Sequence, residues 1–204
     1  MALAGDVALR LEAIAVRARA CTRCALSESR TQAVPGEGTG NIGILLVGEA
    51  PGRTEDETGR PFCGAAGRNL DLALAAAHIE RGDTFVTSIV KCRPPENRDP
   101  TLAEKAACRP YLVDQIKVLR PRVIVALGRH GLSAVVPDAP KSFTELAGGF
   151  CGSFEGVPVW VSLHPAAVIY RQAWKEKYLD DWRRFGGWVA AGMPASDTEF
   201  AGRN

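Results

Sequence analysis

Four of the six cysteines have a spacing typical of metal ligands. Cys21 and Cys24 form a C-x2-C pair, and Cys92 and Cys108 make a second pair much later in the chain. Clustered thiolates in a cytosolic protein usually hold a metal, because disulfides do not persist there. Four thiolates fit either tetrahedral zinc or a [4Fe–4S] cluster, and the spacing, which differs from that of a ferredoxin, favours zinc over iron. The alternative is that the second pair consists of ordinary buried thiols.

A carboxylate, an aromatic ring and an imidazole form a second group of candidate residues. Glu49 lies in a turn-forming segment, Phe62 precedes a Gly-rich helix start, and His164 follows an apolar run. Carboxylates and imidazoles can act as general acids and bases, and the ring could stack on a planar ligand. The alternatives are a capped turn for Glu49, core packing for Phe62 and a structural role for His164. His78 and His130 lie in helical positions and receive no functional interpretation.

The elements that would position these residues can be read from hydrophobic patterns. Short apolar runs predict strands at residues 42–47, 84–90, 123–127 and 157–161. Helical segments are predicted at residues 1–20, 64–77, from about 101, 128–135 and 174–191, and Thr101 and Glu104 form a capping box. This alternation predicts a parallel sheet covered by helices. Working residues then gather at the carboxyl ends of the strands, after Val47, near Val90, after Leu127 and after Val161.

Length and composition fit one globular domain. The chain has 204 residues, of which 46% are hydrophobic, so we expect a single domain over 1–204 with a core at about 21–191 and a frayed tail from 192 to 204. The N-terminal segment has charges among its apolar positions, which predicts an amphipathic helix and not a signal peptide. No apolar run is long enough for a membrane span. We therefore expect a cytoplasmic protein with no membrane partner.

The charge is nearly balanced overall but uneven along the chain. The formal net charge is +2, yet the stretch from Lys91 to Arg122 holds eight basic residues against four acidic ones. A local basic surface would suit binding to a nucleic-acid backbone. A solvated helix face is the alternative explanation.

Taken together, the motifs resemble those of the uracil-DNA glycosylase superfamily, most closely its iron–sulfur family 4. The resemblance runs from about Cys21 to Arg184 and is strongest in GEAPGRTEDETGRPF (48–62), SIVKCRPPENR (88–98) and LHPA (163–166). Each motif alone is weak, but the ordered set is specific. The resemblance implies an α/β three-layer sandwich with a central four-stranded parallel sheet flanked by helices. It also implies that the four cysteines hold a [4Fe–4S] cluster, which reverses the preference for zinc.

The resemblance further implies an enzyme that flips a base out of DNA and hydrolyses its N-glycosidic bond, leaving an abasic site. Phe62 matches the family's stacking residue, and His164 matches the histidine that stabilises the anion developing on the base. Glu49 matches the carboxylate that orients water or favours the cationic sugar. Backbone amides around Gly48 and Ala50 would bind base or phosphate oxygens.

The loop after the histidine wedges into DNA in related enzymes. Its counterpart here nominates four DNA-binding residues, namely Val168, Ile169, Tyr170 and Arg171. We expect a monomer that acts on single- or double-stranded DNA containing a deaminated base.

One position departs from the family pattern. Where the family has an asparagine that reads the uracil edge, this chain has Ser88. A hydroxyl cannot pair at once with a ring N–H and a carbonyl as an amide can, which should weaken discrimination by about 1–3 kcal/mol. We therefore predict relaxed base choice that extends to xanthine or hypoxanthine. The competing outcome is a weak or redirected uracil enzyme.

Two other functions stay open at this point. The first is a catalytically weak iron–sulfur module that binds DNA lesions or has a redox role. The second is a zinc α/β hydrolase acting on a small molecule, which needs an open metal position that four cysteine ligands would not leave. The cluster itself is expected to have a structural role, in which it links the first helix to the Pro-rich loop after Cys92 (residues 93–100).

Overall fold

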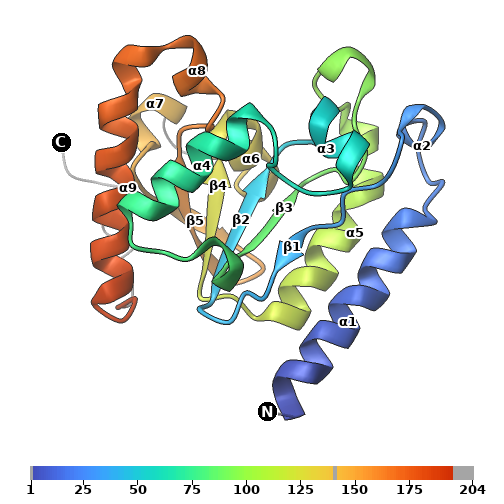
Figure 1. The fold of residues 1–204 in the computed structure, drawn as a ribbon, viewed down its shortest axis with the longest axis horizontal. Helices are drawn as coiled ribbons and strands as arrows, with labels where there is room; N and C mark the ends of the chain where they lie inside the picture. Colours follow the sequence, from blue (N-terminus) through green and yellow to red (C-terminus); the bar gives the residue numbers. More distant parts are fainter. Residues whose placement is uncertain (1, 140–141, 195–204) are drawn as a thin grey trace.

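The computed structural model describes residues 2–139 and 142–194, and its centre is a mixed sheet (Figure 1). The strands in chain order are β1 (Glu37–Gly38), β2 (Ile44–Gly48), β3 (Phe85–Ser88), β4 (Val123–Leu127), β5 (Gly149–Phe154) and β6 (Val157–Ser162). Their order across the sheet is β1-β3-β2-β4-β6-β5. The four inner strands are mutually parallel, which confirms the predicted four-stranded parallel core.

The two edge strands were not predicted from the sequence. The two-residue β1 pairs antiparallel with β3, and β5 pairs antiparallel with β6. An irregularity in register separates Phe150 from Ser153, and Gly152 between them has a positive φ of 61°. Because β5 is interrupted in this way and only partly buried, it lacks the continuous apolar run that marks the inner strands.

Helices cover both faces of the sheet. The α-helices are α1 (Ala2–Arg19), α2 (Leu26–Ser29), α3 (Arg53–Thr58), α4 (Ala65–Ala76), α5 (Leu102–Leu119), α6 (Gly128–Val135), α7 (Phe143–Leu146), α8 (Ala167–Tyr170) and α9 (Lys175–Ala190). Short 3-10 turns are η1 (Arg81–Asp83), η2 (Pro95–Asn97) and η3 (Gln172–Trp174). The predicted capping box starts α5, since the Glu104 amide donates to Thr101 Oγ1 and the Thr101 amide donates to the Glu104 carboxylate.

The strand side chains divide between two hydrophobic cores, one on each face. On β2, Leu45 and Val47 share a core with residues of α1, α5 and α6, whereas Ile44 and Leu46 share one with residues of α4 and α9. All four are fully buried, as expected for a parallel strand covered on both faces. Figure 1 shows α4 beside α9 and α1 beside α5. The predicted three-layer sandwich is therefore confirmed.

None of the helices in the described part of the chain is both long and apolar enough to cross a membrane. Of the tail that the sequence predicts to be frayed, residues 195–204 lie outside the described residues.

Candidate functional site

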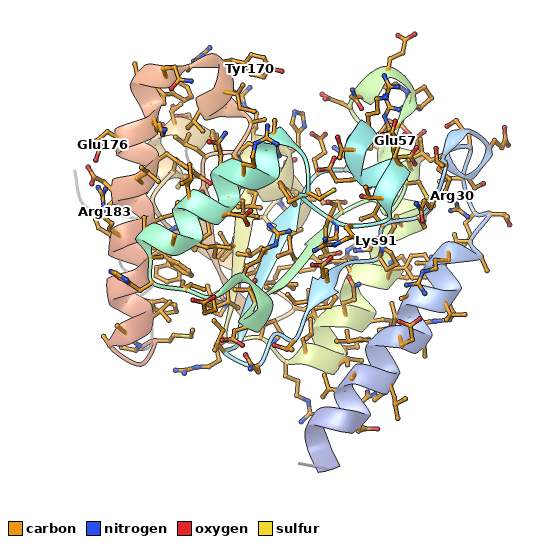
Figure 2. All side chains as sticks on the ribbon, in the orientation of Figure 1. Arg30, Glu57, Lys91, Tyr170, Glu176 and Arg183 are labelled. Atoms are coloured by element: carbon orange, nitrogen blue, oxygen red, sulfur yellow. The ribbon has the colours of Figure 1, made fainter. Side chains whose placement is uncertain are left out.

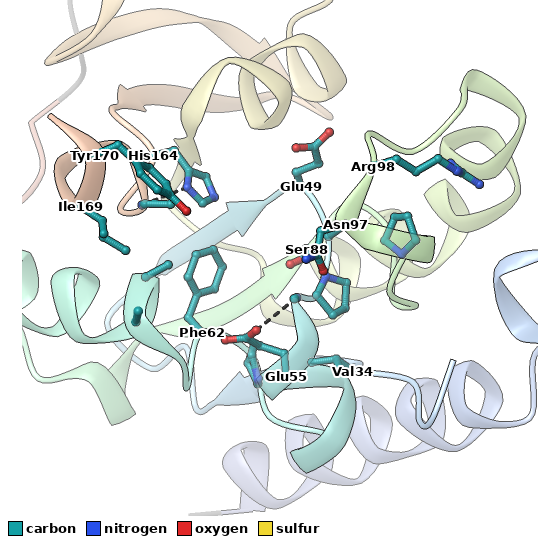
Figure 3. A pocket seen from close by; sticks show the side chains of 18 residues that line it. Val34, Glu49, Glu55, Phe62, Ser88, Asn97, Arg98, His164, Ile169 and Tyr170 are labelled. Atoms are coloured by element: carbon teal, nitrogen blue, oxygen red, sulfur yellow. Dashed lines mark hydrogen bonds between the residues drawn. The ribbon is translucent and has the colours of Figure 1, made fainter. Parts of the chain in front are cut away.

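A cavity of about 480 Å³ opens at the carboxyl edge of the parallel strands (Figure 3). Glu49 follows β2, Ser88 ends β3, and His164 follows β6, so three strands deliver one side chain each. The predicted site residues that line the cavity are Glu49, Ala50, Phe62, Ser88, His164, Ile169 and Tyr170. Because the carboxyl ends of parallel strands meet at one edge of the sheet (the strand-end rule), residues from distant parts of the chain come together there.

Two glycines allow Phe62 to occupy its place. A Cβ on Gly48 would lie 2.5 Å from Cζ of the Phe62 ring, and a Cβ on Gly67 would lie 1.8 Å from the Phe62 carbonyl oxygen. Both contacts are far inside van der Waals separation, so only glycine fits at either position without movement. Phe62 itself has a φ of +48°, a conformation that is uncommon for a bulky residue. The backbone of Gly48 therefore packs directly against the Phe62 ring, although Gly48 itself does not line the cavity.

Glu55 holds the loop that carries Phe62, a role that sequence reasoning missed. Its carboxylate accepts hydrogen bonds from the backbone amides of Gly52, Cys63 and Gly64 at 2.9–3.1 Å. It also lines the cavity. The signal was available in the sequence, because a glutamate three residues after the N-cap can accept a hydrogen bond from the N-cap amide, here that of Gly52 at the start of α3.

His164 is arranged as a neutral hydrogen-bond donor. The amide of Ala166 donates to His164 Nδ1 at 3.1 Å, so the ring proton of the neutral form sits on Nε2. Burial, with a smaller contribution from the nearby His130, lowers the pKa of His164 to about 4. Gly128, with a φ of +85°, makes room for the histidine, since a Cβ there would lie 2.7 Å from the Cβ of His164.

Glu49 lies beside a histidine to which the sequence analysis gave no role. His130 Nδ1 is 3.3 Å from Glu49 Oε1, and His130 Nε2 is 3.5 Å from Asp99 Oδ2. Burial raises the pKa of Glu49, while the charges of His130 and Lys105 act to lower it and that of Asp99 to raise it. His130 is the third residue of α6, directly after β4, so the strand-end rule could have found it.

The backbone of Ser88 accepts a hydrogen bond from the buried side chain of Lys91. Lys91 Nζ donates to the Ser88 carbonyl oxygen at 2.7 Å, to Thr87 Oγ1 at 2.6 Å and to Gln115 Oε1 at 2.9 Å. Burial lowers the pKa of Lys91 to about 8. These bonds fix the backbone at the end of β3, and with it the position from which the Ser88 side chain faces the cavity.

The loop after His164 only partly matches the prediction. Ile169 and Tyr170 line the cavity, and Tyr170 is 85% exposed at the outer end of α8 (Figure 2). The Arg171 guanidinium is exposed and stacks on the Trp174 ring at 4.4 Å. Val168 is 2% exposed and packs into the core shared with α4 and α9, so the structure corrects its assignment as a DNA-binding residue. The single turn of α8 directs Val168 inward while its neighbours face outward.

The four predicted ligand cysteines meet in one place. Cys21, Cys24, Cys92 and Cys108 all line a small cavity near the start of the Pro-rich loop. Cys63 and Cys151 do not line it. The sequence pairs are thus brought together by α1, the segment after β3 and α5.

Positive groups and amides surround these thiols. Arg30 Nη1 donates to Cys92 Sγ at 3.0 Å, and the Lys91 amide donates to Cys108 Sγ at 3.3 Å. Arg30 and Lys91 both border the cavity, on the side of the sheet covered by α5 (Figure 2). Such donors stabilise negative charge on sulfur, as metal-bound thiolates require.

The four thiols offer four sulfur donors around one small cavity. Four cysteine thiolates are the ligand set both of a structural zinc ion and of a [4Fe–4S] cluster. The donor set therefore fits a four-cysteine metal centre.

The basic residues between Lys91 and Arg122 do not form one free charged face. Lys91 is buried, Arg98 pairs with Glu104 at 2.7 Å, and Arg109 pairs with Glu155 at 3.2 Å. The local excess of positive charge is thus partly neutralised within the fold. Arg98 nevertheless lines the cavity from the Pro-rich loop, together with Pro94 and Asn97.

The chain is similar in sequence to a known protein family over most of its length. The family model described as the uracil DNA glycosylase superfamily matches residues 35–183. The chain is 44% identical over 173 residues to a type-4 uracil-DNA glycosylase of Pyrobaculum aerophilum, covering 82% of this chain and 88% of the relative. It is 42% identical over 159 residues to the type-4 enzyme of Thermotoga maritima, covering 78% and 83%. The corresponding enzyme of Archaeoglobus fulgidus is 41% identical over 172 residues, covering 81% and 86%.

The matched region contains the parallel strands, all cavity-lining residues except Val34, and two of the four clustered cysteines. A family model that spans most of the chain and several relatives above 40% identity leave one assignment. This chain belongs to the uracil DNA glycosylase superfamily.

Proposed function

We propose that this protein is a monofunctional uracil-DNA glycosylase, which hydrolyses the bond between a flipped uracil and its deoxyribose and leaves an abasic site. The observation that carries the proposal is the convergence of Glu49, Phe62, Ser88 and His164 on one cavity. Relatives named type-4 uracil-DNA glycosylases, at 39–44% identity over most of the chain, support it.

Phe62 supplies the surface on which the extruded base stacks. Stacking of a base on an aromatic ring is worth about 1–3 kcal/mol and tolerates any base. The cavity volume of about 480 Å³ falls within the range of roughly 300–1,000 Å³ that is common for small-molecule pockets. Phe62 therefore binds and orients the base, and selectivity must come from the polar groups around it.

His164 stabilises the departing base. As the glycosidic bond breaks, negative charge develops on the base and is shared by its carbonyl oxygens. A neutral imidazole with its proton on Nε2 can donate a hydrogen bond to one of these oxygens. The Ala166 amide already occupies Nδ1, so the donor is preorganised and no tautomer change is needed. A low pKa keeps the imidazole neutral, so donation is by a hydrogen bond and not by full proton transfer.

Glu49 acts on the sugar side of the bond. The transition state of N-glycoside cleavage resembles an oxocarbenium ion, and a carboxylate placed nearby favours that positive charge or orients the attacking water. Either role requires the ionised form. Partial burial of the carboxylate strengthens its interaction with the cation, because the local dielectric is lower than that of water.

The four clustered cysteines would hold a [4Fe–4S] cluster. A bound cluster would form iron–sulfur bonds to these cysteines and would so cross-link the N-terminal segment, the start of the Pro-rich loop and α5. Arg30 and the Lys91 amide offset the negative charge of the thiolates. This cross-link stabilises the loop that brings Asn97 and Arg98 to the cavity.

An oligonucleotide assay tests the proposed function. Purified protein is incubated with strands that contain one uracil, and abasic sites are revealed by alkaline cleavage; matched strands with thymine serve as the control. We expect cleavage at uracil and none at thymine. Binding of uracil-containing DNA without cleavage would support the alternative of a weak lesion-binding module and would contradict the proposal.

A further inference from the structure

Glu49 belongs to a group of titratable side chains whose other two members, His130 and Asp99, have no part in the proposed mechanism so far. One carboxylate oxygen or ring nitrogen of each residue lies within 4.8 Å of the corresponding atoms of the other two. They come from three separate places: the Pro-rich loop, the first turn of α6 and the end of β2. Glu49 is 20% exposed, His130 41% and Asp99 69%, so the group runs from the cavity outward to solvent.

Both nitrogens of the His130 ring face a carboxylate oxygen. A neutral imidazole has one donor and one acceptor, and its acceptor nitrogen would be repelled by a carboxylate. The two carboxylates flank the ring, with oxygens 3.3 and 3.5 Å from its two nitrogens, which is ion-pair distance for an imidazolium.

Glu49 needs such a neighbour. Its Oε1 atom is buried and makes no hydrogen bond among the described residues, and an unpaired buried carboxylate oxygen is unfavourable. The His130 ring lies at ion-pair distance from this oxygen, so a positive charge on the ring would compensate the negative charge of the Glu49 carboxylate.

We propose that His130 is a positioning residue for the excision reaction, which holds the Glu49 carboxylate ionised and correctly placed, and that Asp99 in turn holds the His130 ring. This inference rests on the proposed uracil excision. His130 acts through Glu49 and does not touch the base. Because Asp99 is largely exposed, its contribution is the smaller of the two.

The other charged residues around this group have defined effects. Lys105 of α5 also favours the ionised form of Glu49. His164 packs against Gly128 at the start of α6, and the charge of a protonated His130 would lower the pKa of His164. Arg129 precedes His130 on α6 and is exposed. A positive charge at position 130 therefore favours the ionised form of Glu49 and the neutral form of His164, which are the two states that the proposed reaction uses.

The pH dependence follows from these contacts. Burial raises the pKa of Glu49, and the His130 charge opposes that rise. Loss of the charge raises the pKa of Glu49 further, so the ionised form disappears at a higher pH as the solution is acidified. The acidic limb of the kcat profile should move to higher pH in variants that lack a charge at position 130.

The test compares His130→Phe, His130→Gln and His130→Lys with His78→Asn, a matched histidine substitution at an exposed position with a left-handed backbone that asparagine tolerates. We expect His130→Phe and His130→Gln to lower kcat about three- to tenfold with little change in KM, and to shift the acidic limb upward. His130→Lys should restore the limb, and Asp99→Asn should have a smaller effect. His78→Asn should behave as the native protein.

A double-mutant cycle shows whether the effect passes through Glu49. In a Glu49→Gln background, His130→Phe should cause no further loss of kcat. Native kcat and pH profile in the folded Phe and Gln variants would overturn the inference, as would full additivity with Glu49→Gln. In either case excision by the native protein would leave the proposed function intact. A native protein that excises no uracil would instead refute the function itself, and this inference with it.

Discussion

The rings of Phe62 and His164 lie 5.9 Å apart between centroids, with an angle of 40° between their planes. One ring follows β2 and the other follows β6 on the same edge of the sheet. A planar base that stacks on Phe62 in this cavity would therefore lie close to His164. The relationship makes the orientation of the base, and so the reaction, depend on how accurately the Phe62 ring is placed.

The contact between Gly48 and Phe62 predicts a selective loss of activity in Gly48→Ala. The added methyl group would lie 2.5 Å from Phe62 Cζ and must push the ring into the cavity. We expect kcat/KM for uracil excision to fall at least about tenfold, with a loss of stability of about 1–3 kcal/mol. Gly82→Ala is the matched control, since no atom lies within 4 Å of its added Cβ. Equal activity of the two variants would show that the ring position does not matter.

The buried imidazole of His164 predicts a pH-dependent stability. Its pKa falls from 6.5 to about 4 on folding, so on acidification the unfolded chain takes up a proton before the folded chain does. Stability contributed by this group is complete above pH 6.5 and is lost as the pH falls from about 6.5 to 4. We expect the free energy of unfolding of the native protein to drop by about 2 kcal/mol more than that of His164→Gln over this interval. Denaturant titrations that give parallel curves for the two proteins would contradict the assignment.

Removal of one clustered cysteine should release the cofactor. Cys108→Ser is expected to lose the broad visible absorbance and most of about four iron atoms per chain. It should also expose the N-terminal segment to limited proteolysis, because the cross-link to α5 is broken. Cys63→Ser is the matched control, since Cys63 lies outside the thiol cavity. A full iron content in Cys108→Ser, or zinc in place of iron in the native protein, would contradict the assignment.

Ser88 predicts the range of bases that are excised. A hydroxyl at the end of β3 cannot make the paired hydrogen bonds of an amide, so we expect measurable excision of hypoxanthine or xanthine beside uracil. Ser88→Asn should narrow the preference toward uracil by about ten- to a hundredfold. Excision rates on a panel of oligonucleotides, each with one deaminated base, measure the preference. Strict uracil preference in the native protein, unchanged in Ser88→Asn, would refute relaxed base choice.

The inner sheet could be predicted because β2 and β4 are continuous apolar runs that only a doubly covered parallel strand requires. Glu49, Ser88 and His164 could then be placed on one edge by topology alone. The edge strand β5 could not, because its glycines and exposed residues carry no strand signal.

The burial of the Val168 side chain could not be predicted from the sequence either, because it depends on how α8 packs on the core. His130 is a different case. The sequence predicts that the position after β4 belongs to the functional edge, but a histidine in a helical position carries no functional signal of its own. Only the structure shows that its ring faces Glu49 and Asp99.

The most direct test of the account is the single-turnover rate of uracil excision by native protein and by His164→Gln. If His164 donates to the departing base from within the Phe62 cavity, the rate constant should fall about 10²–10³-fold while DNA binding is retained. Abasic sites formed at the native rate by the folded His164→Gln protein would show that the chemistry takes place elsewhere.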